Sequence, residues 1–270
     1  MTDLTDPPAD EHAAPKEAAA EASLPQRLIG EARELFRFLL VAVPAYLAFT
    51  TVAFAAYHIP SESMVPAMEV GDRVIVSKFA YGYSRQSLPL NIGALLPAGR
   101  TRFLEQAPKR GDVIVFMHPQ EDKVMIKRLI GLPGDEIALR DGVLWINGEK
   151  VRRFDGETIV RVAQGGALEP AARYNENLPG GVTHVIHEFS DHEVYDEFGP
   201  YIVPPRHIFA MGDNRDNSMD SRWSGMGPVP MDNLIGRAET VYFAMPQFGK
   251  KRTGIEPAAH RWFEPLARRK

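Results

Sequence analysis

The chain begins with one long apolar run and continues with many short ones. Residues 38–57 (FLLVAVPAYLAFTTVAFAAY) form 20 consecutive positions without a charged side chain. A helix of that length rises about 30 Å, the thickness of the hydrocarbon core of a bilayer, and a buried core helix rarely stays uniformly apolar for so long. We therefore expect a transmembrane helix at 35–57, in which Pro44 is tolerated.

Basic residues on either side of this run predict its orientation. Arg27, Arg33 and Arg37 precede it, whereas the first basic residue after it is Arg73. Because positive charges favour the cytoplasmic side, we expect a single-pass protein of the inner (plasma) membrane with a cytoplasmic N-terminus and its main body on the outer, periplasmic face. A cleavable signal peptide ending at Ala53–Ala55 is the alternative, but the stretch before the apolar run is long for one.

Beyond the apolar run, the pattern changes to short runs of β-branched residues separated by turn signals. Asp141-Gly142 joins two runs as a two-residue hairpin, and Asn147-Gly148 marks the next turn. No long amphipathic helix is expected there, so the pattern predicts a mainly β, antiparallel body with a closed or folded-over sheet. The expected strands are Arg73–Lys78, Asp112–Met117, Lys123–Ile130, Glu136–Leu139, Val143–Ile146, Thr158–Ala163, Val182–His187, His207–Met211 and Ala238–Ala244.

Composition suggests how the chain is divided. Its first 23 residues hold seven Ala, three Pro and six acidic residues without an apolar face, as disordered tails do. A Gly-, Pro-, His- and acid-rich stretch in the second half is interpreted as an insertion, and the basic C-terminal end as a solvated tail. The expected organisation is a disordered tail at 1–34, the helix at 35–57, a β body at 58–149 and 206–248, an inserted β cap at 150–205 and a basic tail at 249–270.

Charge and cysteine content exclude several classes of protein. The 270 residues include 31 Lys and Arg against 35 Asp and Glu, for a formal net charge of −4, and no Cys. This balance argues against a nucleic-acid-binding protein, which usually carries a basic face. The lack of Cys excludes disulfide scaffolds, Cys nucleophiles, iron–sulfur clusters and Cys-ligated zinc.

Familiar metal and hydrolase motifs do not fit either. In HEFSDH (187–192) the two histidines are five residues apart, so one helical face cannot present both to zinc. The acidic stretch Asp213–Asp220 lacks the Gly and Glu spacing of an EF-hand. No G-x-S-x-G and no P-loop is present. We therefore expect neither a metal nor a cofactor.

Three polar segments remain as candidates for chemistry: Ser61–Ser63 between two prolines, Lys127 among apolar neighbours, and the loop 211–222. Taken singly, each has a structural explanation as a helix cap, a snorkelling lysine or a turn. Together they fit a Ser–Lys dyad, because a serine needs a base and a desolvated, neutral lysine can supply it. The Ser63 amide and the Ser61 hydroxyl would then form an oxyanion hole, and Ser218 would orient the amine.

These segments also resemble a known family. Four stretches are similar, in the same order, to the sequence boxes of type I signal peptidases, and a G-x-V-P at 227–230 follows them. They are P-S-E-S-M (60–64), R-G-D-V-I-V-F (110–116), M-I-K-R-L-I-G-L-P-G-D (125–135) and M-G-D-N-R-D-N-S-M-D-S-R (211–222). The resemblance covers roughly residues 35–245 and implies an antiparallel β body with an inserted β cap.

The resemblance also implies roles for individual residues. Ser63 is expected to be the nucleophile, Lys127 the general base, Ser218 its orienting hydroxyl and Ser61 the second oxyanion donor. Two ion pairs, Arg128 with Asp213 and Arg222 with Asp220, are expected to hold the site, and the substrate pockets to be lined by Ile59, Pro60, Met64, Met68, Met125 and Ile126. The sequence departs from the family's common pattern at Glu62, where many members have a small residue, and in a longer 222–230 loop.

The expected activity is therefore removal of signal peptides from secreted preproteins after small, Ala-x-Ala-like residues. The expected partners are those preproteins and the lipid bilayer, with no nucleic acid. Three other readings stay open: a self-cleaving repressor-type protease, an anchored β domain that binds secretory peptides without turnover, and a processing peptidase specialised for pilus or conjugation precursors. The repressor reading lacks support, because the first 57 residues offer no DNA-binding helix pair.

Overall fold

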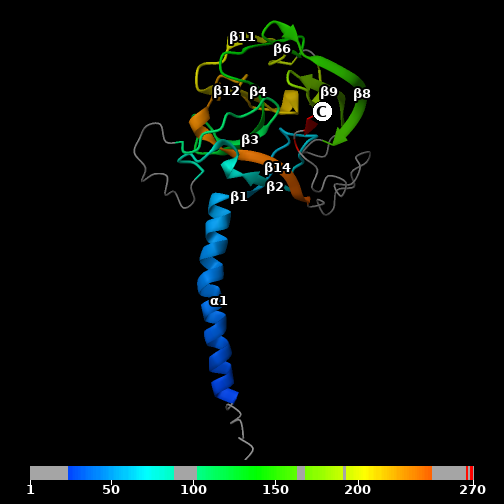
Figure 1. Ribbon diagram of the computed structural model, residues 1–270. Coiled ribbons are helices and arrows are strands. Elements are labelled where there is room, and N and C mark those ends of the chain that lie inside the picture. Colours follow the sequence, from blue (N-terminus) through cyan, green and yellow to red (C-terminus); the bar gives the residue numbers. More distant parts are fainter. Residues whose placement is uncertain are drawn as a thin grey trace, which may run out of the picture. The chain divides into compact units, whose positions relative to one another are not determined.

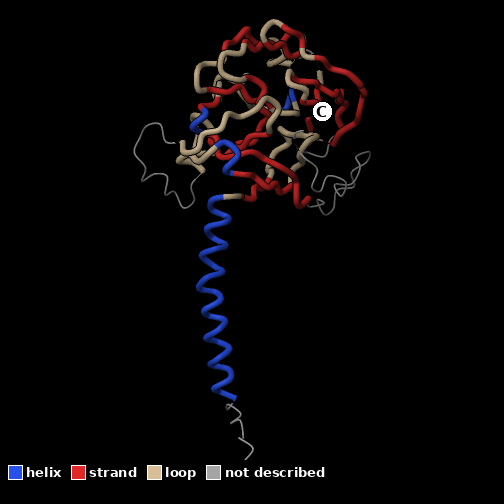
Figure 2. The backbone as a smooth tube through the Cα atoms, in the orientation of Figure 1, coloured by secondary structure: helices blue, strands red, loops and turns tan. Residues whose placement is uncertain are grey.

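The computed structural model describes residues 24–87, 102–162, 168–190, 193–244, 266 and 268–269. Its contacts divide the chain into two compact units, Met1–Leu47 and Ala48–Lys270. Strands make up most of the regular structure in the second unit, together with a few short helical turns (Figure 2). The expectation of a mainly β, antiparallel body is confirmed.

Helix α1 (Leu24–Val52) starts earlier and stops sooner than the expected helix at 35–57. Pro25 stands in its first turn, where a missing N–H costs no helical hydrogen bond. The helix stops because Phe54–His58 form strand β1, whose backbone pairs antiparallel with the strand that follows it in the sequence. Residues 24–34 are therefore helical rather than part of a disordered tail, and residues 1–23 lie outside the described chain.

Of the helices in the described residues, none has both the length and the apolar character needed to cross a membrane.

A seven-stranded antiparallel sheet carries the centre of the body, and its strands lie near one another in Figure 1. The strand order is β1-β2-β14-β3-β4-β12-β13, so strands distant in sequence become neighbours. The added strands are β2 (Asp72–Ser77), β3 (Val113–Met117), β4 (Val124–Gly131), β12 (His207–Met211), β13 (Val229–Pro230) and β14 (Leu234–Ala244). Short 3₁₀ turns lie between these strands in the sequence: η1 (Lys78–Tyr81), η3 (Arg215–Asn217) and η4 (Met231–Asn233).

Two four-stranded sheets form the remainder of the body, and their strands do not follow the boundaries expected for the cap at 150–205. One has the order β11-β5-β6-β7 and the other β15-β10-β9-β8. Their strands are β5 (Glu136–Arg140), β6 (Val143–Ile146), β7 (Glu149–Lys150), β8 (Arg152–Val162), β9 (Leu168–Leu178), β10 (Val182–Glu188), β11 (Phe198–Ile202) and β15 (Arg268–Arg269). The boundary expected at residue 150 therefore separates strands that share a sheet, because β11 pairs with β5.

The central sheet is buried on both faces, which explains the uninterrupted apolar run VIVFM in β3. Val113 and Val115 face one cluster, whereas Ile114 and Phe116 face another, as strand alternation requires. We name the first group the Met64 cluster. Its buried members are Ile59, Met64, Met68, Val74, Val76, Val113, Val115, Ile235, Ala238 and Val241, and Tyr57, Ile126 and Leu266 pack against it half-buried.

The C-terminal end was expected to be a solvated tail at 249–270. Of this range the structure describes only residues 266 and 268–269. These three residues contact the body: β15 pairs with β10, and Leu266 packs on the Met64 cluster. For the described part of the tail, the expectation of a solvated segment is wrong, because backbone pairing and an apolar contact fix its position.

Candidate active site

Ser63 lies in the turn between β1 and β2, directly against the loop 211–222. The Asn214 amide donates to the Ser63 carbonyl at 3.2 Å, and the Asn214 side chain donates to the Glu62 carbonyl at 3.1 Å. Gly212 permits this approach, since a Cβ there would lie 2.4 Å from the Ser63 carbonyl oxygen and 2.3 Å from Ser218 Oγ. The serine itself is 7% exposed, so it is reachable but largely enclosed.

Lys127 comes from the middle of β4, opposite Ile114 of β3. Its Nζ lies 2.6 Å from Ser63 Oγ, and it also donates to the Ile126 carbonyl at 3.1 Å. The side chain is buried, at 2% exposure. Two residues 64 positions apart in the sequence thus meet at hydrogen-bond distance.

Burial lowers the pKa of Lys127 from 10.5 to about 8. Desolvation is the main cause because it disfavours the ammonium form. The carboxylates of Asp220 and Asp213 act in the opposite direction, while Lys123 and Arg222 add to the lowering. A substantial fraction of Lys127 is consequently neutral near pH 8, unlike an ordinary lysine.

The two flanking serines differ in how they contact this pair. Ser61 is exposed, and its Oγ lies 3.4 Å from Ser63 Oγ. Ser218 is 7% exposed, but among the described residues its Oγ has no hydrogen-bond partner. The structure therefore brings Ser61 to Ser63, while it shows no hydrogen bond from Ser218 to the Lys127 amine.

Two buried ion pairs lie in the same region. Arg128 donates to both oxygens of Asp213, at 2.8 and 2.7 Å, and both side chains are 1% exposed. Arg222 donates to both oxygens of Asp220 at 2.9 Å, and Gly212 N adds a bond at 3.0 Å. Burial alone would raise the pKa of Asp220, but Arg222 outweighs it and holds that pKa below its usual value. These ion pairs fix the position of the loop 211–222 near its beginning, at Asp213, and near its end, at Asp220 and Arg222.

The six residues expected to line substrate pockets do not form a single group. Ile59, Met64 and Met68 are buried in the Met64 cluster, and Ile126 packs on it. Met125 alternates to the other face of β4 and packs on the cluster that contains Phe116, and Pro60 is exposed. The apolar surface beside Ser63 is therefore built mainly from the Met64 cluster.

The sequence matches the family described as "Signal peptidase, peptidase S26" over residues 32–243, which is most of the chain. The chain belongs to this family. It is 34% identical over 220 residues to signal peptidase I of Rickettsia bellii, covering 79% of this chain and 73% of that protein. It is 39% identical over 202 residues to signal peptidase I of Pseudomonas fluorescens, covering 71% and 65%. A solved signal peptidase I of Enterococcus faecalis matches at 28% identity and a TM-score of 0.30, covering 49% of this chain and 97% of that one.

This signal peptidase is therefore a serine endopeptidase, and the resemblance identified from its motifs is confirmed. The matched range includes the Ser63 turn, the Lys127 strand and the loop 211–222. It also includes β8, β9 and β10, from which further charged groups reach the loop.

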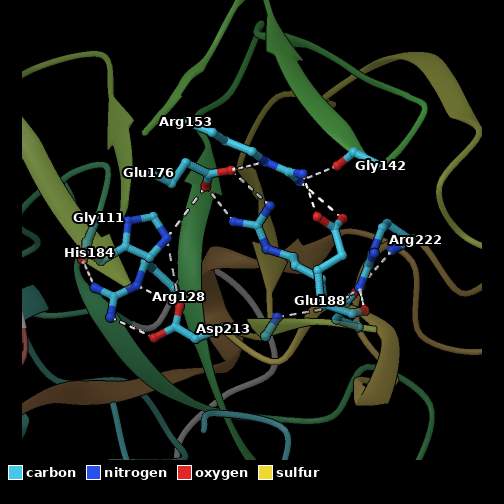
Figure 3. A network of polar contacts seen from close by, with 12 residues as sticks. Gly111, Arg128, Gly142, Arg153, Glu176, His184, Glu188, Asp213 and Arg222 are labelled. Carbon is cyan, nitrogen blue, oxygen red and sulfur yellow. Dashed lines mark hydrogen bonds and ion pairs between the residues drawn. The ribbon is translucent and has the colours of Figure 1, made fainter. Parts of the chain in front are cut away.

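A charged network of this peptidase joins β9 to the loop 211–222 (Figure 3). Glu176 of β9 is fully buried and accepts two hydrogen bonds from Arg215, one of them 2.9 Å long. Burial alone would raise the pKa of Glu176, but Arg215 and Arg153 together lower it, so the carboxylate is charged. This ion pair fixes the position of η3. The turn η3 directly follows Asn214, whose amide donates to the Ser63 carbonyl.

Two further groups complete the network. His184 lies between Glu176 (3.4 Å) and Asp213 (3.8 Å), and burial together with the nearby Arg128 and Arg215 lowers its pKa well below 6.5. Glu188 pairs with Arg153, yet burial prevails and raises its pKa to about 7. His184 is thus neutral at pH 7, while Glu188 titrates near it.

Among the described residues, one group of three carboxylates is close enough together to hold a metal ion. Oxygen atoms of Glu188, Asp196 and Asp216 lie within 4.8 Å of one another. Arg153 already engages Glu188, and Asp216 accepts hydrogen bonds from the amides of residues 189 and 190. Asp196 accepts a hydrogen bond from the Glu193 amide at 2.6 Å, so each of the three carboxylates has at least one partner in the protein.

Arg128 and its ion pair with Asp213 were expected from the sequence, but other members of this network outside the loop were not. Glu176, His184 and Arg153 sit on strands without any recognisable motif. Arg215 and Asp216 lie inside the G-D-N-R-D-N-S stretch, and their charge was the one available signal that buried partners must exist elsewhere in the chain.

Proposed function

We propose that the chain removes N-terminal signal peptides from secreted preproteins with Ser63 as nucleophile and Lys127 as general base. The observation that carries this proposal is the 2.6 Å separation of Lys127 Nζ from Ser63 Oγ, with the amine buried and its pKa lowered to about 8. A serine hydroxyl becomes nucleophilic when a neutral base accepts its proton. Membership of the signal peptidase family supports the substrate class.

The proposed reaction is acyl transfer through a covalent intermediate. Neutral Lys127 takes the Ser63 proton while Ser63 Oγ attacks the scissile carbonyl carbon, and the resulting ammonium donates that proton to the leaving amine. A water molecule, deprotonated by the same amine, then hydrolyses the ester and regenerates Ser63. In this proposal the Ser63 amide and the Ser61 hydroxyl stabilise the oxyanion. The Ser218 hydroxyl, which has no hydrogen-bond partner among the described residues, is assigned to orient the amine during the reaction.

Substrate selectivity is assigned to the apolar surface beside the nucleophile. Ile59, Met64 and Met68 are at most 2% exposed, so the apolar region they form is tightly packed and a pocket beside it leaves little room for a bulky side chain. An Ala side chain fits against such a surface, whereas a longer one requires displacement of packed atoms. This accounts for a preference for small, Ala-x-Ala-like residues before the cleaved bond.

Membrane anchoring through α1 is part of the proposal. The helix carries no charged residue after Arg37, and side chains such as Leu40 and Val41 are 63% and 70% exposed. Exposed apolar surface of this kind favours lipid, and the arginines before it favour a cytoplasmic N-terminus. In the sequence Ser63 comes soon after the end of α1 at Val52, so anchoring would keep it within a short chain length of the bilayer surface, where a signal peptide leaves the membrane.

Incubation of the purified, detergent-solubilised chain with a preprotein tests the proposed function. We expect release of an intact signal peptide and a mature protein whose new N-terminus, read by mass spectrometry, follows an Ala-x-Ala sequence. An anchored domain that binds secretory peptides without turnover would retain the preprotein uncleaved. Cleavage restricted to pilus or conjugation precursors would favour the specialised peptidase.

The pH dependence of cleavage follows from the Lys127 pKa. Because the deprotonated amine is the active form, the rate should rise with pH and level off above about 8. The neutral fraction would be roughly 1% at pH 6 and roughly 90% at pH 9 for such a pKa. Single-turnover rates between these values measure the profile, and a rate independent of pH would contradict a lysine base.

A further inference from the structure

The described C-terminal residues contact three strands of the body, and one of these strands, β4, carries Lys127. The Leu266 amide donates to the Glu239 carbonyl of β14 at 3.1 Å, and its carbonyl accepts from Arg128 Nη1 at 3.2 Å. Two residues further on, β15 begins and pairs with β10 at Thr183 and Val182. Hydrogen bonds therefore hold Leu266 to β14 and to Arg128 of β4, and the pairing of β15 holds the chain just beyond it.

The Leu266 side chain touches the surface that the proposed function uses for selectivity. It packs half-buried against the Met64 cluster, as does Ile126, the residue before Lys127 in β4. Met64, which directly follows the nucleophile in the sequence, is a buried member of this cluster, as are Ile59 and Met68. A side chain that is half-buried on this cluster forms part of its boundary with solvent rather than part of its interior.

We propose that Leu266 is a specificity-determining residue that forms an outer wall of the pocket for the small substrate residues. The inference rests on the proposed function and extends it to a residue far from every motif in the sequence. The backbone hydrogen bonds of Leu266 fix its position, and its isobutyl group limits the size of the substrate side chain that the pocket accepts. The C-terminal residues thereby contribute to substrate selection.

Truncation of this side chain should widen the pocket. One methylene in an apolar pocket typically changes discrimination about 10- to 200-fold. Leu266→Ala is thus expected to raise the ratio of kcat/KM for a Val-containing cleavage site to kcat/KM for an Ala-containing one by at least about tenfold. Leu266→Phe is expected to lower the same ratio, because it narrows the pocket.

The experiment uses the full-length chain and two preproteins that differ in one residue, Ala or Val, at the position three before the cleaved bond. Leu168→Ala is the matched control, since Leu168 lies on β9 and is 64% exposed. The control should leave the ratio unchanged. A ratio is the chosen readout because partial unfolding lowers both rates by the same factor.

A higher Val-to-Ala ratio of kcat/KM in Leu266→Ala and a lower one in Leu266→Phe would support the proposal that Leu266 borders the pocket. An unchanged ratio in both variants, with cleavage by the wild type intact, would overturn it while leaving the proposed function standing. If Leu266→Ala yields no folded protein, Leu266→Phe and Leu266→Val decide by the same comparison. Failure of the wild type to cleave either preprotein would instead contradict the proposed function.

Discussion

Replacing Ser63 by Ala, or Lys127 by Met, is expected to lower the rate of preprotein cleavage by a factor on the order of 10⁴ to 10⁶. The first change removes the attacking oxygen, and the second removes the group 2.6 Å away that accepts its proton. Because the two act as one unit, the double variant should be no slower than either single one. Product formation in single-turnover reactions gives the three rates.

The Lys127 variants also separate chemistry from stability. Met has a similar length without an amine, so Lys127→Met removes a buried group whose burial lowers its pKa to about 8 and should leave the fold at least as stable. Lys127→Arg keeps a charge that does not dissociate near neutral pH and should also be inactive. Unfolding curves measured beside the rates would show inactivity without loss of structure.

Glu62→Ala is the matched control for both substitutions. Glu62 is next to the nucleophile, and its carboxylate accepts an exposed hydrogen bond from the Asn217 side chain at 3.2 Å. The variant should keep the rate within about tenfold of wild type, since an exposed hydrogen bond such as the one to Asn217 contributes little. Cleavage by Ser63→Ala or Lys127→Met at the rate of this control would refute the dyad.

Asp213→Ala should destabilise the fold by about 3–5 kcal/mol, a large share of the roughly 5–15 kcal/mol typical of folded domains. The reason is that Arg128, 1% exposed, would keep its charge and lose both carboxylate bonds. The remaining acceptors, the carbonyls of Gly111 and Leu266, are neutral. Urea unfolding of the full-length protein, followed by Trp fluorescence, measures the change.

Glu157→Ala provides the comparison for this loss. Glu157 pairs with Arg173 at 3.2 Å, but the two side chains are 57% and 47% exposed. Solvent screens such a pair, so the expected loss is below about 1 kcal/mol. Equal losses in the two variants would show that the Arg128 charge is compensated elsewhere.

The strands that could be predicted from the sequence are those with their own local signal. β3, β4, β6 and β12 are short runs that contain β-branched or aromatic residues and lie between turn residues, and each lies within a residue or two of its expected range. β9 (LEPAARYNENL) has no such signal and was not expected. It is a strand because β8 and β10 pair with it on both sides.

The end of α1 shows the same limit. Residues 54–57 continue the apolar run that predicts a helix, and no local feature marks the change at residue 54. Pairing with β2 supplies backbone hydrogen bonds from a distant segment, and the strand forms instead. Period and hydrophobicity describe a segment's own preferences, whereas the partner that satisfies its backbone lies elsewhere.

By itself, the sequence determined the mainly β body, the family and the chemical identity of the candidate serine and lysine, since each depends on residue types and short spacings. Only the tertiary structure decided that Lys127 is buried at hydrogen-bond distance from Ser63, that Glu176 holds Arg215, and that Leu266 packs on the Met64 cluster. Burial and ion pairing depend on which distant segments exclude water from a group. That is a property of the packed chain, and it sets the pKa on which the proposed reaction depends.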